Sequence, residues 1–192
     1  MSSKDKIITA AIEVFSEHGY HRASMDEIAL RACVAKGTLY YNFPNKAQLF
    51  KTLVKQGLQE IMDTTCQALD MPLTLEESIQ RVIRLNLDMF LESTNFAHII
   101  FNELSNGIEQ EVLLEIKELR REYLHFLADI LEESKCGGYV RDVNCMIAAT
   151  SIVGMLQSSC NYYLNNKNEM SREDLEYFLF TLITKGLFTT HA

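Results

Sequence analysis

Residues 20–46, YHRASMDEIALRACVAKGTLYYNFPNK, predict two short helices joined by a tight turn. Ser24, with Glu27 three residues later, forms a capping box that marks the start of the first helix. The turn falls at Cys33, and the second helix covers residues 35–41. This second helix is too sparsely apolar to belong to a core, and its outer face carries a cation, a glycine, a hydroxyl and two tyrosines. A short exposed helix of this kind suits a DNA groove.

The segment and its flanks, from Ile8 to about Val54, resemble the TetR family of transcriptional regulators. The resemblance is carried by Phe15, Gly19, Tyr20, Ile28, Ala29, residues 34–43, Lys46 and Leu49. The chain departs from the common family pattern at four positions. Ala23 stands where threonine is frequent, Cys33 where glycine is frequent, Ala35 where serine is frequent and Asn42 where histidine is frequent. The rest of the chain matches the family only in length and helical layout. The resemblance implies a helix-turn-helix regulator whose C-terminal part binds a small molecule.

The resemblance also implies which residues touch DNA: Ser24, Ala35, Lys36, Gly37, Thr38, Tyr40, Tyr41, Asn42 and Lys46. Lys36 is the candidate reader of base edges, because a flexible cation can donate to guanine acceptors. Gly37 would let the backbone approach the duplex closely, and most of the other side chains would contact phosphates and fix the register. Two alternatives stay open, since Tyr40 can pack against the first helix of the chain and Lys46 can be a solvated cation.

The charge distribution supports a DNA-binding head at the N-terminus. The whole chain has a net charge of −8, which alone argues against a partner as acidic as DNA. Residues 1–55, however, hold eight Lys/Arg and five Asp/Glu, a net charge of +3, whereas residues 56–192 carry −11. The positive charge therefore coincides with the motif, and the acidic remainder should face away from DNA.

The five cysteines form no C-x-x-C pair and are odd in number, which indicates reduced thiols in a cytoplasm. No metal site and no cofactor is expected. No apolar run follows the opening MSSKDK, so no signal peptide is expected. Residues 144–166 carry no charge but contain several polar side chains, and without eighteen consecutive apolar residues they are not expected to span a membrane.

Helical periodicity without a competing strand pattern predicts an all-α fold of about nine helices. Residues 1–50 would form a three-helix DNA-binding head, and residues 51–192 a helical domain for effector binding and dimerisation. Besides the two short helices, the expected helices cover residues 4–18, 46–69, 74–92, 95–104, 109–134, 142–166 and 171–188. Four of these have expected N-caps, at Asn45, Thr74, Asp142 and Ser171.

The last two helices predict a homodimer. The helix at about 142–166 is almost free of charge, so it should be buried on most sides. The helix at about 171–188 has two apolar stripes, one with Leu175 and the other with Tyr177 and Phe180. Two stripes imply two partners, the subunit's own core and a second copy, and this arrangement resembles the four-helix dimer interface of the TetR family.

The family resemblance implies that an effector enters the C-terminal helices and relieves repression. The candidate pocket residues are mostly apolar or aromatic at helical spacing: Met62, Cys66, Asn86, Phe90, Phe96, Ile100, Glu103, Tyr123, Phe126, Met155 and Tyr162. For each of them alone, core packing is the more frequent role. Asn86 and Glu103 share faces with apolar residues, and such inward polar groups need a partner from a ligand, the backbone or water. With few inward charges, the expected effector is apolar or weakly polar, or cationic given the acidic surroundings.

Together these features predict a sequence-specific transcriptional regulator, a repressor that its effector releases from a near-palindromic operator. An enzyme is not expected, because the chain has no H-E-x-x-H, phosphate-loop or G-x-S-x-G motif. The alternative is a helical interaction protein that retains the helix-turn-helix scaffold without effector-controlled DNA binding. The surface formed by Lys36, Gly37 and Thr38 argues against this alternative.

Overall fold

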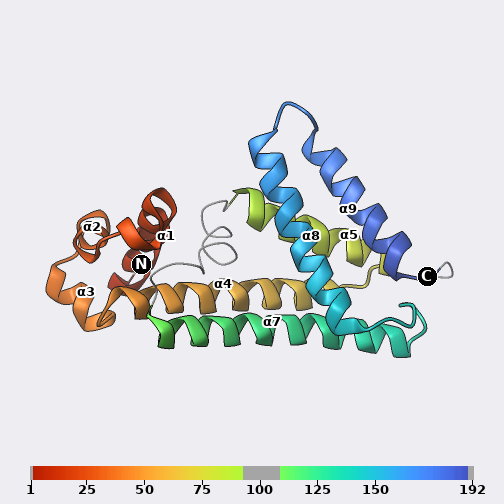
Figure 1. Cartoon of the computed structure of the whole chain (residues 1–192), viewed down its shortest axis with the longest axis horizontal. Helices are drawn as coiled ribbons and strands as arrows, with labels where there is room; N and C mark the ends of the chain where they lie inside the picture. The colour runs from red at the N-terminus through yellow and green to blue at the C-terminus, as the bar shows by residue number, and fades with distance from the viewer. Residues whose placement is uncertain (1, 93–108, 190–192) are drawn as a thin grey trace. The chain divides into compact units, whose positions relative to one another are not determined.

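The computed structural model describes residues 2–92 and 109–189 of the chain. These residues form eight α-helices, labelled as in Figure 1: α1 (Ser3–Arg22), α2 (Met25–Arg31), α3 (Lys36–Asn42), α4 (Lys46–Leu69), α5 (Leu75–Glu92), α7 (Gln110–Cys136), α8 (Cys145–Asn165) and α9 (Arg172–Leu187). Within the described residues, the one strand-like pairing is an isolated antiparallel bridge between Val140 and Phe188. The predicted all-α class is confirmed, and the helix expected at residues 95–104 lies outside the described residues.

The chain divides into two compact units. The first consists of residues 1–59 and 93–120, and the second of residues 60–92 and 121–192. Helices α4 and α7 contribute to both units, because the divisions fall inside them. Among the helices formed by the described residues, none is long and apolar enough to cross a membrane.

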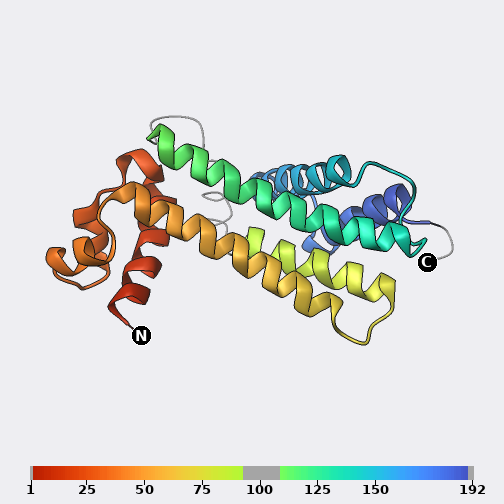
Figure 2. The ribbon, with the colours of Figure 1, turned by 90° about the horizontal axis from the view of Figure 1, so that it is seen from below.

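The first unit is built around three aromatic rings. Helices α1, α2 and α3 contact one another in pairs, and Figure 2 shows them gathered around the start of α4. The ring centroids of Phe15 and Phe50 lie 5.3 Å apart, and those of Tyr20 and Phe50 lie 4.9 Å apart, both edge-to-face. All three rings are at most 3% exposed. Such aromatic pairs add stability beyond the burial of their surface. This cluster therefore stabilises the packing of α1 on α4, and α2 and α3 pack against α1.

The end of α1 and the start of α2 largely follow the sequence signals. Gly19 has a φ of +71°, a conformation that favours glycine, so the regular part of α1 ends where the sequence predicts. The hydroxyl oxygen of Ser24 accepts a hydrogen bond from the Glu27 N–H at 3.1 Å, which confirms Ser24 as the N-cap. The second half of the predicted capping box is different, because the Glu27 carboxylate contacts His18 at 3.0 Å and Arg31 at 3.3 Å. The Glu27 carboxylate therefore pairs with basic side chains on α1 and α2.

In the second unit, α5, α8 and α9 pack against one another, and Figure 1 shows α8 and α9 side by side in opposite directions. Two ion pairs join α5 to α9. Arg84 contacts Glu176 at 2.7 Å, and Asp88 pairs with Arg172. Both pairs lie partly in solvent, so they guide the packing of α9 more than they stabilise it.

Most helix starts are capped as predicted, with one correction at α8. Side chains at Asn45, Thr74 and Ser171 accept backbone hydrogen bonds from the first turns of α4, α5 and α9. At α8 the cap is Asn144, whose Oδ1 accepts from the Ile147 N–H at 3.0 Å. The expected cap, Asp142, instead contacts Lys135 at 3.0 Å. A cap must directly precede the first helical residue, so α8 begins two residues later than predicted.

Candidate functional site

The turn between α2 and α3 determines how α3 is presented. The Cys33 N–H donates to the Leu30 carbonyl and the Val34 N–H to the Ala29 carbonyl, both at 3.0 Å, which is a Schellman motif. Cys33 has a φ of 53° and is the one non-glycine residue with a positive φ in the described part of the chain. The turn leaves α3 on the outside of the first unit, with Leu39 as its buried anchor.

Lys36 is the first residue of α3, and its ammonium group already has an acidic partner. Its Nζ lies 2.6 Å from Oδ2 of Asp26 on α2. The two side chains are 65% and 59% exposed, so the pair is screened by water and easily exchanged for another anion. Asp26 therefore lies on the same surface as the predicted base reader, where its charge opposes the approach of phosphate.

The rest of the α3 surface is open. A Cβ atom at Gly37 would meet no other atom within 4 Å, and the φ of Gly37 is not positive. Neither packing nor backbone conformation thus requires a glycine here. Tyr41 is 89% exposed and Tyr40 is 47% exposed, so two aromatic rings accompany Gly37 on this face. The Asn42 side chain donates to the Thr38 carbonyl at 2.8 Å and remains at the end of the helix.

Lys46 at the start of α4 is held by the chain that leads into α2. Its Nζ donates to the carbonyl oxygens of His21 at 3.1 Å and Ala23 at 3.0 Å. The same atom lies 4.6 Å from the centroid of the Tyr20 ring, a cation–π arrangement. Partial burial lowers the pKa of Lys46. The ammonium group therefore connects α4 to the end of α1, and its use as a phosphate contact stays a prediction.

One group of side chains between α1 and α2 has the residue types of a metal site. Glu17, His18 and Glu27 each offer a ligand atom within 4.8 Å of the others. The Arg31 guanidinium already lies 2.6 Å from Glu17 and 3.3 Å from Glu27. Its hydrogen bond with Glu17 raises the pKa of Arg31. This group is an ion-pair network that holds α2 against α1.

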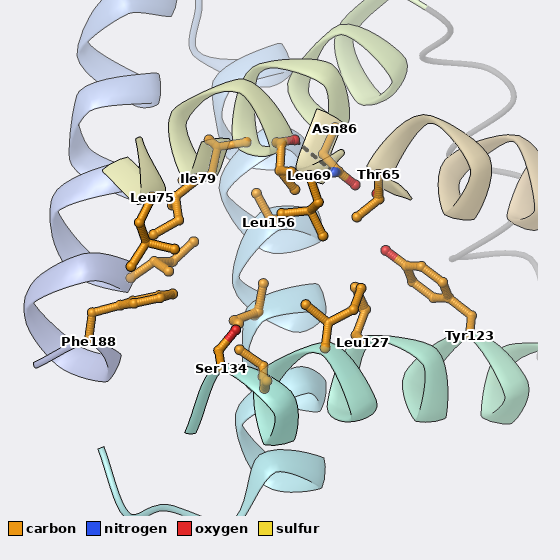
Figure 3. Close-up of a pocket in the computed structure, with 16 residues that line it drawn as sticks. Thr65, Leu69, Leu75, Ile79, Asn86, Tyr123, Leu127, Ser134, Leu156 and Phe188 are labelled. Carbon is orange, nitrogen blue, oxygen red and sulfur yellow. Dashed lines mark hydrogen bonds between the residues drawn. The ribbon is translucent and has the colours of Figure 1, made fainter. Parts of the chain in front are cut away.

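The second unit contains a cavity of about 120 Å³. Its lining comes from α4, α5, α7, α8, α9 and the residue that follows α9: Thr65, Leu69, Leu75, Ile79, Val82, Ile83, Asn86, Tyr123, Leu127, Ile130, Leu131, Ser134, Ile152, Leu156, Ile183 and Phe188. Most of these side chains are aliphatic, and Figure 3 shows them directed toward one another around the hollow. A cavity with such a lining is suited to an apolar ligand group.

Three of the four polar side chains that line the cavity lie together, and Ser134 lies apart from them. Figure 3 shows Thr65, Asn86 and Tyr123 at one end and Phe188 at the other. The Asn86 side chain donates to the Val82 carbonyl at 2.8 Å, so its partner is the backbone. Burial raises the pKa of Tyr123, and its hydroxyl group therefore stays protonated at neutral pH. The cavity thus offers hydroxyl and amide groups, with no charged side chain among the residues that line it.

The predicted pocket residues are distributed over several places. Asn86 and Tyr123 line the cavity. Three lie outside the described residues: Phe96, Ile100 and Glu103. Six lie in the second unit away from the lining: Met62, Cys66, Phe90, Phe126, Met155 and Tyr162. Tyr162 is 51% exposed, and its hydroxyl donates to Glu169 at 2.6 Å. As ligand contacts, all eleven remain predictions.

Sequence reasoning missed most of the lining and one member of the α3 surface. The spacing of Ile79, Ile83 and Asn86 gave a usable signal, because it identifies the inward face of α5. No comparable signal selects Phe188, which follows the end of α9. Asp26 was also missed, because it meets Lys36 only through the geometry of the turn.

Comparison with known protein families decides the identity of the chain. Residues 7–53 match the bacterial regulatory proteins of the tetR family, and residues 72–187 match the tetracyclin repressor-like C-terminal domain. The second match alone covers more than half of the chain. The chain belongs to the TetR family. As a TetR-family member it is a DNA-binding transcriptional regulator that acts as a dimer on operator DNA and responds to a small-molecule effector, as predicted.

Similar TetR-family proteins include regulators of fatty acid metabolism. The fatty acid metabolism regulator protein of Bacillus subtilis (strain 168) is 26% identical over 183 residues, which are 95% of this chain and 94% of that protein. FadR from Bacillus halodurans, a fatty acid degradation regulator, has a solved structure with a TM-score of 0.85 and 26% identity, covering 97% of this chain and 96% of its own. FadR from Bacillus subtilis, solved in complex with stearoyl-CoA, gives a TM-score of 0.81 and 26% identity, with coverage of 95% and 98%. These relatives are named as regulators and not as enzymes.

Proposed function

We propose that this protein is a cytoplasmic repressor whose operator binding is released by a long-chain acyl thioester, with acyl-CoA as the ligand class. The observation that carries the proposal is the almost wholly apolar cavity of the second unit. It occurs in a chain that is 26% identical, over nearly its full length, to a regulator solved with stearoyl-CoA. Of the apolar and cationic effectors expected from the sequence, this lining favours the apolar class.

The size of the cavity says how an acyl chain would bind. An apolar cavity of about 150 Å³ in another protein holds benzene, so a hollow of about 120 Å³ accommodates only a short stretch of a long chain. The rest of the ligand must extend beyond the cavity, or the helices must separate to admit it. Separation of the helices would change the positions of α5 and α7, which supply most of the lining. Helices α4 and α7 are covalently continuous with the first unit, so the chain connects the two units by two helices.

In this proposal residues 1–50 form the DNA-binding domain and residues 51–192 the effector-binding and dimerisation domain. The DNA contacts are the nine residues named from the sequence, with Lys36 as the base reader and Gly37 at the point of closest approach. The exposure of this surface and the free space around Gly37 support the assignment. Two such heads in a dimer would bind a near-palindromic operator whose half-sites lie about one duplex turn apart.

The dimer interface in this proposal is the face of α8 and α9 that carries Ile147, Phe178 and Leu182, whereas the stripe with Tyr177 and Phe180, expected at the interface, lines a hollow of the same subunit. Ile147 is 65% exposed, Phe178 is 55% exposed and Leu182 is 49% exposed, which is an unusual display of large apolar side chains. A Cβ at Gly154 would meet no atom within 4 Å, so a partner helix can approach α8 closely there. Sedimentation at micromolar concentration should show a dimer, and Leu182→Glu should convert it to a monomer. A wild-type monomer under these conditions would contradict the assignment.

The proposal is tested by selecting genomic fragments with the purified protein at near-physiological salt, with Lys36→Ala in parallel. We expect enrichment of a near-palindrome that the variant loses or blurs. Fluorescence anisotropy on that operator then measures release by acyl-CoA ligands of increasing chain length, with free CoA as the ligand that lacks a chain. Each added buried CH₂ contributes about 0.8 kcal/mol, so the half-maximal concentration should fall about fourfold per CH₂ until the cavity is full.

A matched pair of variants connects release to the cavity. Ile130 lines the cavity, whereas Leu124 lies on the same helix, is also half-buried and does not line it. Ile130→Phe should weaken release by long acyl chains, while Leu124→Phe should leave it unchanged. Release by free CoA alone, or equal effects of the two variants, would exclude an acyl chain in this cavity.

A further inference from the structure

A second hollow in the same unit lies beside the apolar cavity. It has a volume of about 600 Å³ and is formed by the start of α5, the side of α9 that carries Tyr177 and Phe180, and the chain around Arg141. Leu75, Ile79 and Phe188 line both hollows. The two are therefore separated by a wall of three apolar side chains. Figure 3 shows Leu75 and Phe188 on this side of the cavity, away from Asn86.

The second hollow, called the groove below, has a different chemistry from the cavity. Arg141 and Lys185 bring two cations to it, and hydroxyl groups come from residues such as Tyr177 and Thr181. Glu76 is the acidic side chain among the residues that line it. Residues 56–192 together carry a net charge of −11, so a pair of cations in one hollow is against the trend of this part of the chain. Such a groove suits an anionic ligand group.

Arg141 is held in place by the segment that also positions Phe188. The bridge between Val140 and Phe188 places the two segments next to each other. The Arg141 N–H donates to the Leu187 carbonyl at 2.9 Å, and its Nε donates to the Phe188 carbonyl at 3.0 Å. The first bond is made by the backbone N–H and the second by the side chain, and together they orient Arg141. A guanidinium group has five N–H donors, and the Nε bond uses only one of them. Its forked geometry matches the oxygen atoms of a phosphate group.

We infer that the groove holds the phosphate-bearing head of the effector whose acyl chain occupies the cavity, with Arg141 and Lys185 as the phosphate contacts. This inference rests on the proposed function, because it takes the effector to be an acyl thioester of a nucleotide. The inference follows from the three residues that the cavity and the groove share. A ligand too long for a cavity of about 120 Å³ must extend out of it, and the groove adjoins the cavity at Phe188. The acyl chain of the ligand then passes Phe188, and the phosphate-bearing head stays in contact with solvent.

The experiment measures dissociation constants of the full-length protein for three ligands with the same acyl chain. These are stearoyl-CoA, stearoyl-pantetheine, which has the thioester without phosphate, and stearate, which has a carboxylate. The variants are Lys185→Gln and the double variant Arg141→Gln/Lys185→Gln. The control is Lys167→Gln, which removes one exposed cation of the same unit outside the groove. The single Lys185 variant keeps the Arg141 bonds, and circular dichroism checks the fold of the double variant.

We expect stearoyl-CoA to lose about tenfold in affinity with Lys185→Gln and more with the double variant. A loss of about tenfold is the size expected when one hydrogen bond to a charged group is removed. Binding of stearoyl-pantetheine should not change, and Lys167→Gln should match the wild type. Unchanged stearoyl-CoA binding in the double variant would overturn the inference while leaving the proposed function intact. Equal losses for stearoyl-CoA and stearate, with none for stearoyl-pantetheine, would assign the groove to a carboxylate and overturn the phosphate assignment. If the wild-type protein binds none of the three, the proposed function itself fails.

Discussion

Replacing Gly37 by alanine should affect stability and DNA binding in opposite directions. Gly37 is the second residue of α3, it is exposed, and an added Cβ would meet no atom within 4 Å. Glycine inside a helix is less stable than alanine by about 0.5–1 kcal/mol, because it loses more backbone freedom on folding. No contact with the described residues offsets this gain, so Gly37→Ala should raise the free energy of unfolding by about that amount.

The size of both effects follows from these contacts. For a chain of this length the gain in stability corresponds to an increase in Tm of roughly 1–4 °C. At the DNA surface, a methyl group placed where the backbone must approach the duplex should cost about 1–3 kcal/mol per head, the cost of an extra methyl group in a well-packed protein core. The dimer carries two such heads, so operator affinity should fall by roughly 30-fold or more. Thermal unfolding and fluorescence anisotropy on the selected operator measure the two effects on the same preparation.

A matched control separates helix propensity from DNA contact. Thr9 is exposed on α1, and Thr9→Ala also improves helix propensity. This variant should gain stability and keep its operator affinity. If Gly37→Ala gains stability and binds the operator as tightly as the wild type, then α3 does not approach DNA at Gly37. If it loses stability, the free space described around this residue is wrong.

Three further predictions concern other side chains. Asp26→Asn should strengthen binding to all DNA sequences and steepen the dependence on log[salt] by about 0.9 per head, or about 1.8 for the dimer, which is about 12-fold between 50 and 200 mM. Asp70→Asn, which removes the same charge from an exposed loop, should do neither. Cys33→Gly should raise the free energy of unfolding by up to about 1 kcal/mol in urea titrations, because Cys33 has a φ of 53°, whereas Cys33→Ala keeps this strain. Burial raises the pKa of Cys160 to about 12, so iodoacetamide at pH 8 should leave this thiol unmodified in mass spectra until urea unfolds the protein, while exposed Cys136 reacts.

The features that the sequence predicted well depend on interactions between residues close in the chain. The Ser24 cap, the turn at Gly19 and the short α3 with Leu39 as its anchor all follow from spacing over one or two turns. The same holds for the cap at Ser171. The error at the start of α8 is also local, because both Asp142 and Asn144 are residue types that cap helices, and sequence alone does not choose between them.

Contacts between distant residues were not accessible in this way. The apolar cavity is lined from five helices and the residue after α9, and which turn of each helix faces it depends on how the helices pack. Asn86 and Tyr123 could be named because helical spacing identifies inward faces, but inward faces also include ordinary core. Spacing shows which side of a helix is buried and leaves open what that side is buried against.

The amino-acid sequence was sufficient for the all-α class, the helix-turn-helix, the unequal charge of the two parts and the TetR resemblance, since each depends on composition or on short-range spacing. The tertiary structure supplied the Asp26 partner of Lys36, the ion pairs of Glu27, the cavity and the groove that adjoins it at Phe188. These require residues far apart in the chain to meet at particular distances. Packing of whole helices sets those distances, and a local sequence pattern does not encode them.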